Sequence, residues 1–284
     1  MSIVVTGATG HLGRLVVEEL LARGVPAEDV VAGGRRVEEL TGLAARGVRV
    51  ARIDYDDAAT VDAALSAGDR LLLVSGSDPA ARVQQHRTVL DAAARTGVAL
   101  VAYTSILRAE DSPLALAGTH RQTEADVRAS GVPFVLLRNG WYTENYAQAL
   151  QEAAATGTVS ASAGDGRVAS AARADYAAAA AAVLAGEGHE GRVYELSGDT
   201  AWTFDELAAA CAEVLGREVS YRRLTTDEHV AVLTGVGLDE PTARFVAGMD
   251  AAIAQGALES ATGDLSRLAG RPTTPLPEAL RPLV

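Results

Sequence analysis

Short apolar runs alternate with amphipathic stretches through the first half of the chain. The apolar runs predict six strands, at 3–5, 30–32, 48–53, 71–74, 99–103 and 134–137. Apolar residues at helical spacing predict helices between them, at 14–23, 37–46, 58–67, 82–96 and 119–130. Buried apolar strands separated by helices are typical of parallel sheets covered on both faces. The pattern therefore predicts an α/β fold with a Rossmann-type, doubly wound parallel sheet.

The pattern changes after Asn139. Helices are expected at 146–155 and 175–185, and a further strand at 193–196. Thr203 and Glu206 have the spacing of a capping box that opens a helix through Val214, and the remainder is mostly helical. We expect a Rossmann domain at 1–140, to whose sheet the strand near 193–196 returns, and a smaller, mostly helical C-terminal lobe at 141–284.

The first strand runs directly into a glycine-rich loop. Gly7 suits a tight turn out of the strand, Gly10 allows a close backbone approach to phosphates, and Gly13 lets the following helix pack closely. The helix N-terminus then offers free N–H donors and positive potential to a pyrophosphate. The spacing predicts a bound dinucleotide, with contacts from Gly7, Ala8, Thr9, Gly10, His11 and Leu12.

The end of the second strand indicates which nicotinamide cofactor is preferred. NADH-dependent enzymes usually carry Asp or Glu there, whereas this strand ends in Gly34, Arg35 and Arg36. A guanidinium at Arg35 suits a 2′-phosphate, so NADPH is expected to bind more tightly than NADH. Asp54, after the third strand, is a candidate acceptor for the adenine amino group. Asp57 is expected to cap the next helix.

Composition and charge exclude several functions. A formal net charge of −12 argues against nucleic-acid or anionic-membrane partners. The one cysteine, Cys211, excludes an internal disulfide, and its apolar surroundings indicate a core residue. No segment approaches the ~20 apolar residues that span a bilayer, so we expect a soluble, cytoplasmic protein.

The chain contains no lysine, because all 25 basic residues are arginine. The Tyr-x-x-x-Lys pair of typical short-chain dehydrogenases, a Schiff-base lysine and a Walker A loop are therefore excluded. The five histidines lack paired metal-ligand spacing, so no metal site is expected. They are His11, His86, His120, His189 and His229. The sequence has no second nucleotide-binding loop, so no flavin site is expected either.

Several segments together resemble the NmrA-like atypical short-chain dehydrogenases, above all the members that reduce quinones with NAD(P)H. The resemblance covers nearly the whole chain, and its most specific block is Leu137-Arg-Asn-Gly-Trp-Tyr-Thr-Glu-Asn-Tyr146. It implies an NADP-binding domain, a substrate-binding lobe, and flavin-free hydride transfer to a quinone. The implied cofactor contacts, besides the glycine loop and Arg35, are Ser75, Gly76, Ser77, Asn139, Gly140, Trp141, Tyr142, Thr143, Glu144 and Arg173.

The chemistry of a quinone acceptor agrees with these residues. Hydride transfer to a flat, electron-poor ring depends mainly on positioning, and the product oxyanion is a weak base, so a strong general acid is dispensable. Trp141 and Tyr142 are expected to wall an apolar slot, and Asn145 to hydrogen-bond a quinone oxygen. The polar candidates for proton transfer are His120 and Tyr103, although a structural place for His120, in a capping turn formed by Thr119 and Gln122, is the favoured alternative.

Two other functions remain open on the sequence. NmrA-like proteins include regulators that bind NADP(H) as redox sensors without turnover, and a related branch reduces triarylmethane dyes. The sequence does not name the physiological acceptor. It also leaves the oligomeric state open, with a homodimer as one option.

Overall fold

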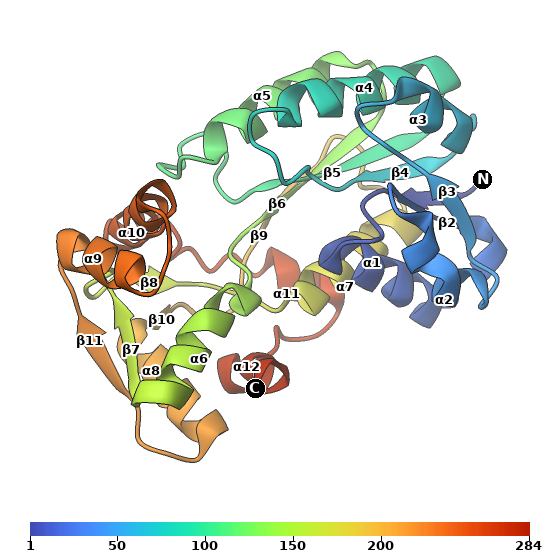
Figure 1. The fold of residues 1–284 in the computed structure, drawn as a ribbon. Helices are drawn as coiled ribbons and strands as arrows, with labels where there is room; N and C mark the ends of the chain where they lie inside the picture. Colours follow the sequence, from blue (N-terminus) through green and yellow to red (C-terminus); the bar gives the residue numbers. More distant parts are fainter.

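A central parallel sheet organises the molecule, as the computed structural model of all 284 residues shows (Figure 1). Its strand order is β3-β2-β1-β4-β5-β6-β9, and every neighbouring pair is parallel. This confirms the Rossmann-type doubly wound fold and the return of the strand at 193–196. The strands are β1 (Ile3–Val5), β2 (Val30–Gly34), β3 (Arg49–Arg52), β4 (Arg70–Leu73), β5 (Leu100–Ile106), β6 (Phe134–Asn139) and β9 (Val193–Leu196).

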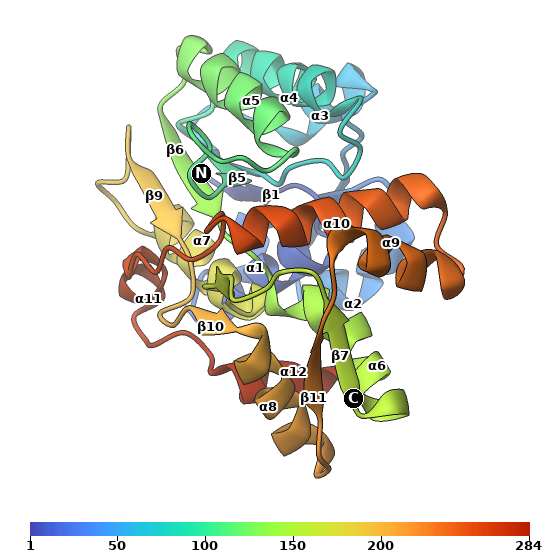
Figure 2. The same cartoon turned by 90° about the vertical axis from the view of Figure 1, so that its left-hand side faces the viewer.

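Helices cover both faces of the sheet. Successive side chains of a strand point to opposite faces, so apolar strands give the sheet two apolar faces that must be buried. In β1, Ile3 and Val5 belong to one apolar cluster and Val4 to the other. The first cluster lies under α1 (His11–Ala22), α2 (Thr41–Ala44), α7 (Arg173–Ala185) and α11 (Asp264–Ala269). The second lies under α3 (Ala58–Ala64), α4 (Arg82–Thr96) and α5 (Ala117–Ala129), at the top of Figure 2.

A second group of elements has an apolar core of its own, centred on Trp202, Phe204 and Leu207. Besides helices it contains two small two-stranded sheets, which the sequence analysis did not predict because their strands are short and partly polar. Its elements are α6 (Ala147–Thr156), β7 (Thr158–Ala161), β8 (Arg167–Val168), β10 (Trp202–Thr203), α8 (Phe204–Leu215), β11 (Ser220–Arg223), α9 (Thr226–Gly235), α10 (Glu240–Ala254) and α12 (Leu276–Leu280). Short 3₁₀ turns lie at Ala27–Asp29, Val37–Leu40, Thr143–Tyr146 and Arg281–Leu283.

Two local predictions are wrong. The helix expected at 37–46 is a 3₁₀ turn followed by the single-turn α2, which contains Gly42, a poor helix former. The capping turn expected at Thr119 does not exist, because α5 already begins at Ala117 and Thr119 lies inside it. The capping box of Thr203 and Glu206 is confirmed, as is the cap at Asp57, whose carboxylate accepts from the Ala59 N–H.

None of the helices combines the length and the apolar character needed to cross a membrane.

Candidate functional site

The loop between β1 and α1 has the geometry of an anion cradle. Gly7 has φ +62°, which favours glycine, and a Cβ at Gly13 would lie 2.4 Å from the Gly7 carbonyl oxygen. Helix α1 begins after Gly10, which provides no side-chain cap, and the Thr9 N–H makes no backbone hydrogen bond. The first-turn N–H groups of α1 also lack intrahelical partners. These donors are therefore free for a phosphate group.

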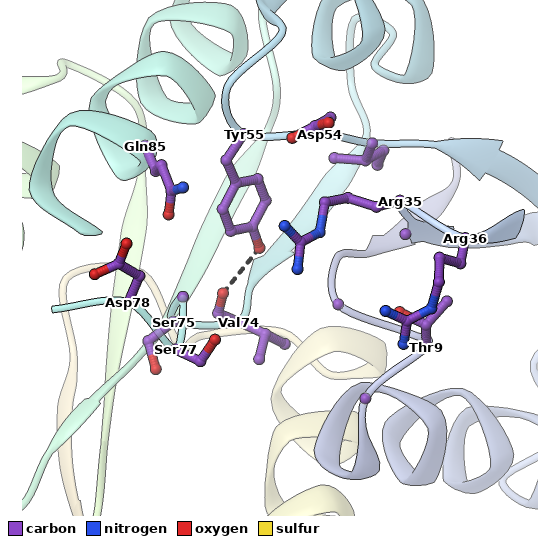
Figure 3. A pocket seen from close by; sticks show the side chains of 15 residues that line it. Thr9, Arg35, Arg36, Asp54, Tyr55, Val74, Ser75, Ser77, Asp78 and Gln85 are labelled. Carbon is purple, nitrogen blue, oxygen red and sulfur yellow. Dashed lines mark hydrogen bonds between the residues drawn. The ribbon is translucent and has the colours of Figure 1, made fainter. Parts of the chain in front are cut away.

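The loop opens onto a cavity of about 310 Å³ at the carboxyl ends of the first four strands, which we call the strand-end cavity. It brings together many of the predicted cofactor residues, as expected for a ligand site in a doubly wound sheet. Figure 3 shows the side chains that line it. The lining residues are Gly7, Thr9, Gly10, Gly34, Arg35, Arg36, Ile53, Asp54, Tyr55, Val74, Ser75, Gly76, Ser77, Asp78 and Gln85.

Arg35 and Arg36 differ in their surroundings. The Arg35 guanidinium points into the strand-end cavity beside Tyr55 (Figure 3), and no carboxylate of the protein lies within salt-bridge distance of it. Arg36 lies beside Thr9 in Figure 3 and forms a two-pronged ion pair with Glu39. Only Arg35 thus offers an unpaired cation to a ligand phosphate.

The segment after β3 forms the wall opposite the glycine loop. Asp54 is half-buried, and its carboxylate accepts from the Asp56 N–H at 3.2 Å. Tyr55 donates to the Val74 carbonyl oxygen at 2.8 Å and shares a hydrogen bond with Thr6. Asp56 is exposed and accepts from the Gln85 amide of α4. The wall is therefore held to both β4 and α4.

The other predicted cofactor residues form a separate group, which we call the Asn139–Arg173 cluster. The Asn139 amide donates to the Tyr142 hydroxyl at 3.3 Å, and Glu144 accepts from the Arg173 N–H at 2.9 Å. The Arg173 guanidinium lies 4.7 Å from the centre of the Tyr142 ring and donates to the Asn145 side chain at 3.2 Å. This cluster follows β6 and meets the start of α7.

Backbone contacts anchor the remainder of this block to the sheet. Gly140 donates to the Leu196 carbonyl oxygen at 2.7 Å, and a Cβ there would lie 2.9 Å from the same atom. Thr143 is buried and its hydroxyl pairs with Ser170 at 2.8 Å. Trp141 is half-buried against the apolar core that contains Trp202, Phe204 and Leu207, whereas Asn145 is exposed. Trp141 and Asn145 thus lie where the sheet meets the second group of elements.

Tyr103 of β5 and His120 of α5 meet between the sheet and its helices, and neither lines the strand-end cavity. Tyr103 is completely buried, and its hydroxyl is 2.8 Å from Nδ1 of His120. Burial, reinforced by the nearby Arg82 charge, lowers the pKa of His120 from 6.5 to about 3. Burial also raises the pKa of Tyr103 well above its usual range. At neutral pH the pair is therefore uncharged.

Sequence reasoning did not identify Tyr55, Gln85 or His86. Tyr55 directly follows Asp54, so its place at a strand end was a usable signal. Gln85 and His86 belong to α4, and their contacts with the cavity wall and with Gly76 depend on how α4 packs on the sheet. No motif in the sequence marks these two residues.

Comparison with known proteins finds a family match and relatives that are similar over nearly the whole chain. Residues 1–257 match the model of the NmrA-like family. Quinone oxidoreductase 2 of Escherichia coli (strain K12) is 45% identical over 278 residues, which are 98% of this chain and 97% of that protein. NAD(P)H azoreductase of Xenophilus azovorans is 30% identical over 95% of this chain and 93% of its own.

Solved structures agree with the sequence matches. The NADPH complex of the E. coli NADPH-dependent quinone oxidoreductase superposes with a TM-score of 0.94 at 45% identity, covering 99% of each chain. The Citrobacter sp. triphenylmethane reductase complexed with NADP(H) gives a TM-score of 0.94 at 38% identity, covering 100% of each chain. By sequence motif, family match and fold, this chain belongs to the NmrA-like family.

Proposed function

We propose that the protein is an oxidoreductase that transfers a hydride from NADPH to a quinone or a similar planar, electron-poor acceptor, without flavin or metal. The observation that carries the proposal is the strand-end cavity, in which free N–H donors and an unpaired Arg35 meet. Supporting it, a relative at 45% identity is a quinone oxidoreductase, and its structure contains NADPH.

The residues of the cavity suit NADPH from one end to the other. We propose that the loop from Gly7 to Leu12 binds the pyrophosphate and that Arg35 binds the 2′-phosphate. Asp54 accepts from the adenine amino group, and Ser75 to Ser77 line the path towards the nicotinamide. We propose that the Asn139–Arg173 cluster orients the nicotinamide end. NADPH supplies the hydride when it is bound.

The acceptor is proposed to lie between the Asn139–Arg173 cluster and the second group of elements. Trp141 and Tyr142 would hold its ring in position, and Asn145 would donate a hydrogen bond to its oxygen. A quinone gains the hydride and one proton to become a hydroquinone while NADPH becomes NADP⁺. Because the oxyanion formed is weakly basic, water can supply that proton, and the uncharged His120 is not required.

A steady-state assay tests this function. Purified protein with NADPH and excess benzoquinone should oxidise NADPH continuously, and EDTA treatment without added flavin should leave the rate unchanged. Tight NADPH binding without turnover would instead identify a redox-sensing regulator. Activity that returns only after flavin or zinc is added would contradict the proposal.

A second candidate substrate is a cationic triarylmethane dye. It is favoured by the 38% identity and full-length superposition with the Citrobacter triphenylmethane reductase. Both acceptors are extended, electron-poor π systems, so both need an apolar slot beside the nicotinamide. The ratio of kcat/KM for benzoquinone and for such a dye would rank them.

Further proposals concern the partner, the cellular location, the division into domains and the oligomeric state. The net charge of −12 favours a small-molecule partner over nucleic acid, and we propose a cytoplasmic location. We also propose that residues 1–140, completed by β9, form the cofactor domain and that 141–284 supply the substrate lobe. Size-exclusion chromatography with light scattering would test whether the protein is a homodimer.

A further inference from the structure

The peptide groups on either side of Gly76 are held by two side chains of α4. The Gly76 N–H donates to Nε2 of His86 at 3.0 Å, and Nε of Arg82 donates to the Gly76 carbonyl oxygen at 2.9 Å. His86 is completely buried and Arg82 is 5% exposed. Gly76 is therefore fixed at both its backbone donor and its backbone acceptor, by groups that water does not reach.

The hydrogen bonds of His86 can be assigned a single direction. A backbone N–H only donates, so Nε2 must accept and the ring proton must be on Nδ1. Nδ1 lies 3.0 Å from the Thr123 hydroxyl, which itself donates to the Thr119 carbonyl oxygen at 3.1 Å. The neutral imidazole thus satisfies both neighbours, and reversing it would place two donors against each other.

Arg82 connects the same loop to α5. Its second nitrogen donates to the Thr119 hydroxyl at 2.8 Å, and that hydroxyl donates to the Leu116 carbonyl oxygen at 3.2 Å. Gly76 is consequently tied to α4 directly and to α5 through both side chains. A rigid support of this kind is what a precise binding loop requires.

The position of Gly76 sets one wall of the strand-end cavity. Ser75, Gly76 and Ser77 all line this cavity, opposite Arg35 and the glycine loop. The fit against α4 is close, since a Cβ on Gly76 would lie 3.1 Å from Oε1 of Gln85 and 3.8 Å from Nε2 of His86. Ser75 is held separately, through its N–H, by Thr104 at 2.9 Å.

We propose that His86 and Arg82 are positioning residues for the cofactor, which hold the Ser75–Ser77 loop in the shape that receives NADPH. Neither residue needs to touch the nucleotide. The inference rests on the proposed function for the identity of the cofactor. It adds that affinity for NADPH depends on buried α4 side chains behind the loop.

The test compares two substitutions at one position. His86→Leu keeps a similar volume but removes the acceptor, leaving the Gly76 N–H unsatisfied, whereas His86→Gln retains an acceptor near the Nε2 position. NADPH fluorescence titration without quinone should show that His86→Leu raises Kd on the order of tenfold. His86→Gln should stay within about threefold of the unmodified protein, because its amide oxygen replaces Nε2. With quinone present, KM for NADPH should rise in His86→Leu while kcat changes little.

A matched control separates positioning from general destabilisation. His229 is also a buried histidine, but it lies in α9 and contacts Ser162 and Asp250, away from the cavity. His229→Leu should lower the thermal midpoint without changing Kd for NADPH. If His86→Leu does not fold, Arg82→Met supplies the same comparison, since it removes the donor to Gly76.

The outcomes distinguish this inference from the proposed function. Unchanged NADPH affinity in a folded His86→Leu or Arg82→Met protein would overturn the inference, as would an equal loss of affinity in His229→Leu. Failure of the unmodified protein to reduce quinones would instead refute the proposed acceptor. The binding measurements would stand in that case, because they contain no quinone.

Discussion

Arg35 and Arg36 are adjacent in the chain but differ in what they can bind. Glu39 neutralises Arg36, while Arg35 faces the strand-end cavity without a carboxylate partner. Sequence placed both at the end of the second strand, but only the side-chain geometry distinguishes them.

The first prediction concerns this pair of arginines. Arg35→Ala should lose about 1.5–3 kcal/mol of NADPH binding, reduced where solvent screens the contact, and should leave NADH binding unchanged. Arg36→Ala is the matched control and should keep the NADPH preference within about threefold, because Glu39 already pairs with it. Titration of both cofactors into each variant measures this. A preference that survives in Arg35→Ala would exclude Arg35 as the 2′-phosphate ligand.

The second prediction concerns proton transfer. His120→Ala and Tyr103→Phe should each keep kcat for benzoquinone within roughly tenfold, because loss of a true general acid costs ~10²–10⁴-fold. Trp141→Ala should lose more, through disorder of the acceptor slot. Rates are to be compared only between folded variants that bind NADPH. A hundredfold fall in kcat for His120→Ala would make His120 the proton donor.

At the scale of elements, an ion-pair network joins β6, α5 and β9. Arg138 of β6 is 5% exposed and donates to Glu124 of α5 at 2.7 and 2.9 Å and to Glu195 of β9 at 2.8 Å. The network also includes Glu110, at 3.0 Å, whose side chain is 77% exposed. It connects the strand that precedes the Asn139–Arg173 cluster to both neighbouring elements.

The third prediction follows from the difference in burial between these carboxylates. Arg138→Met leaves the buried Glu124 only the Ser105 hydroxyl, at 2.6 Å, and the more distant Arg128 guanidinium, at 3.9 Å, so it should lower the free energy of unfolding by about 3 kcal/mol. Glu110→Gln removes an exposed partner of the same guanidinium and should cost at most about 1 kcal/mol. Urea denaturation of both variants measures the difference. Equal effects would show that the network is not held together by its buried pair.

The sequence predicted the elements whose pattern is set by burial. The strands at 30–32 and 134–137 carry continuous apolar runs, and the structure has β2 and β6 there. At their carboxyl ends β2 is longer by Gly33 and Gly34, and β6 by Arg138 and Asn139. Strand β11, Ser-Tyr-Arg-Arg, is mostly exposed and polar, so no apolar pattern marked it. The prediction of a helix at 37–46 was wrong because the apolar spacing continues across Gly42, which is a poor helix former.

The candidate site likewise has one part that the sequence predicted and one part that it did not. The glycine loop, Arg35, Asp54 and the Ser75–Ser77 loop line the strand-end cavity as their positions at strand ends indicated. The support behind that cavity, from His86, Arg82 and Gln85, was not predictable. These residues act through contacts between α4 and the sheet, and such contacts have no sequence spacing.

For the molecule as a whole, buried histidines determine how stability responds to acid. Burial lowers the pKa of both His86 and His120 from 6.5 to about 3, with Arg82 and the other histidine adding to the effect on His86. Between pH 3 and pH 6.5, these two histidines are therefore protonated in the unfolded chain but not in the folded protein. The free energy of unfolding should therefore fall as pH drops below 6.5 and stay level above it.

The fourth prediction gives this effect a size. Going from pH 7 to pH 5 should lower the free energy of unfolding by about 2 kcal/mol for each histidine. His86→Gln should remove about half of that pH dependence. Carboxyls with a lowered pKa, such as Glu39 and Asp239, titrate below this window and do not interfere. Urea denaturation at both pH values measures it, and equal unfolding free energies would contradict it.

The packing of α1 against α7 also bears on how the chain folds as it is synthesised. Helix α1, whose N-terminus forms the phosphate cradle, shares its apolar cluster with α7 and α11, which comprise residues 173–185 and 264–269. A nascent chain that has emerged as far as residue 140 therefore lacks the part of this cluster that α7 and α11 supply, and its β6 is without the neighbour β9. The first helix to leave the ribosome thus completes its apolar packing late, so the phosphate cradle at its N-terminus should gain its full support only after most of the polypeptide has been made.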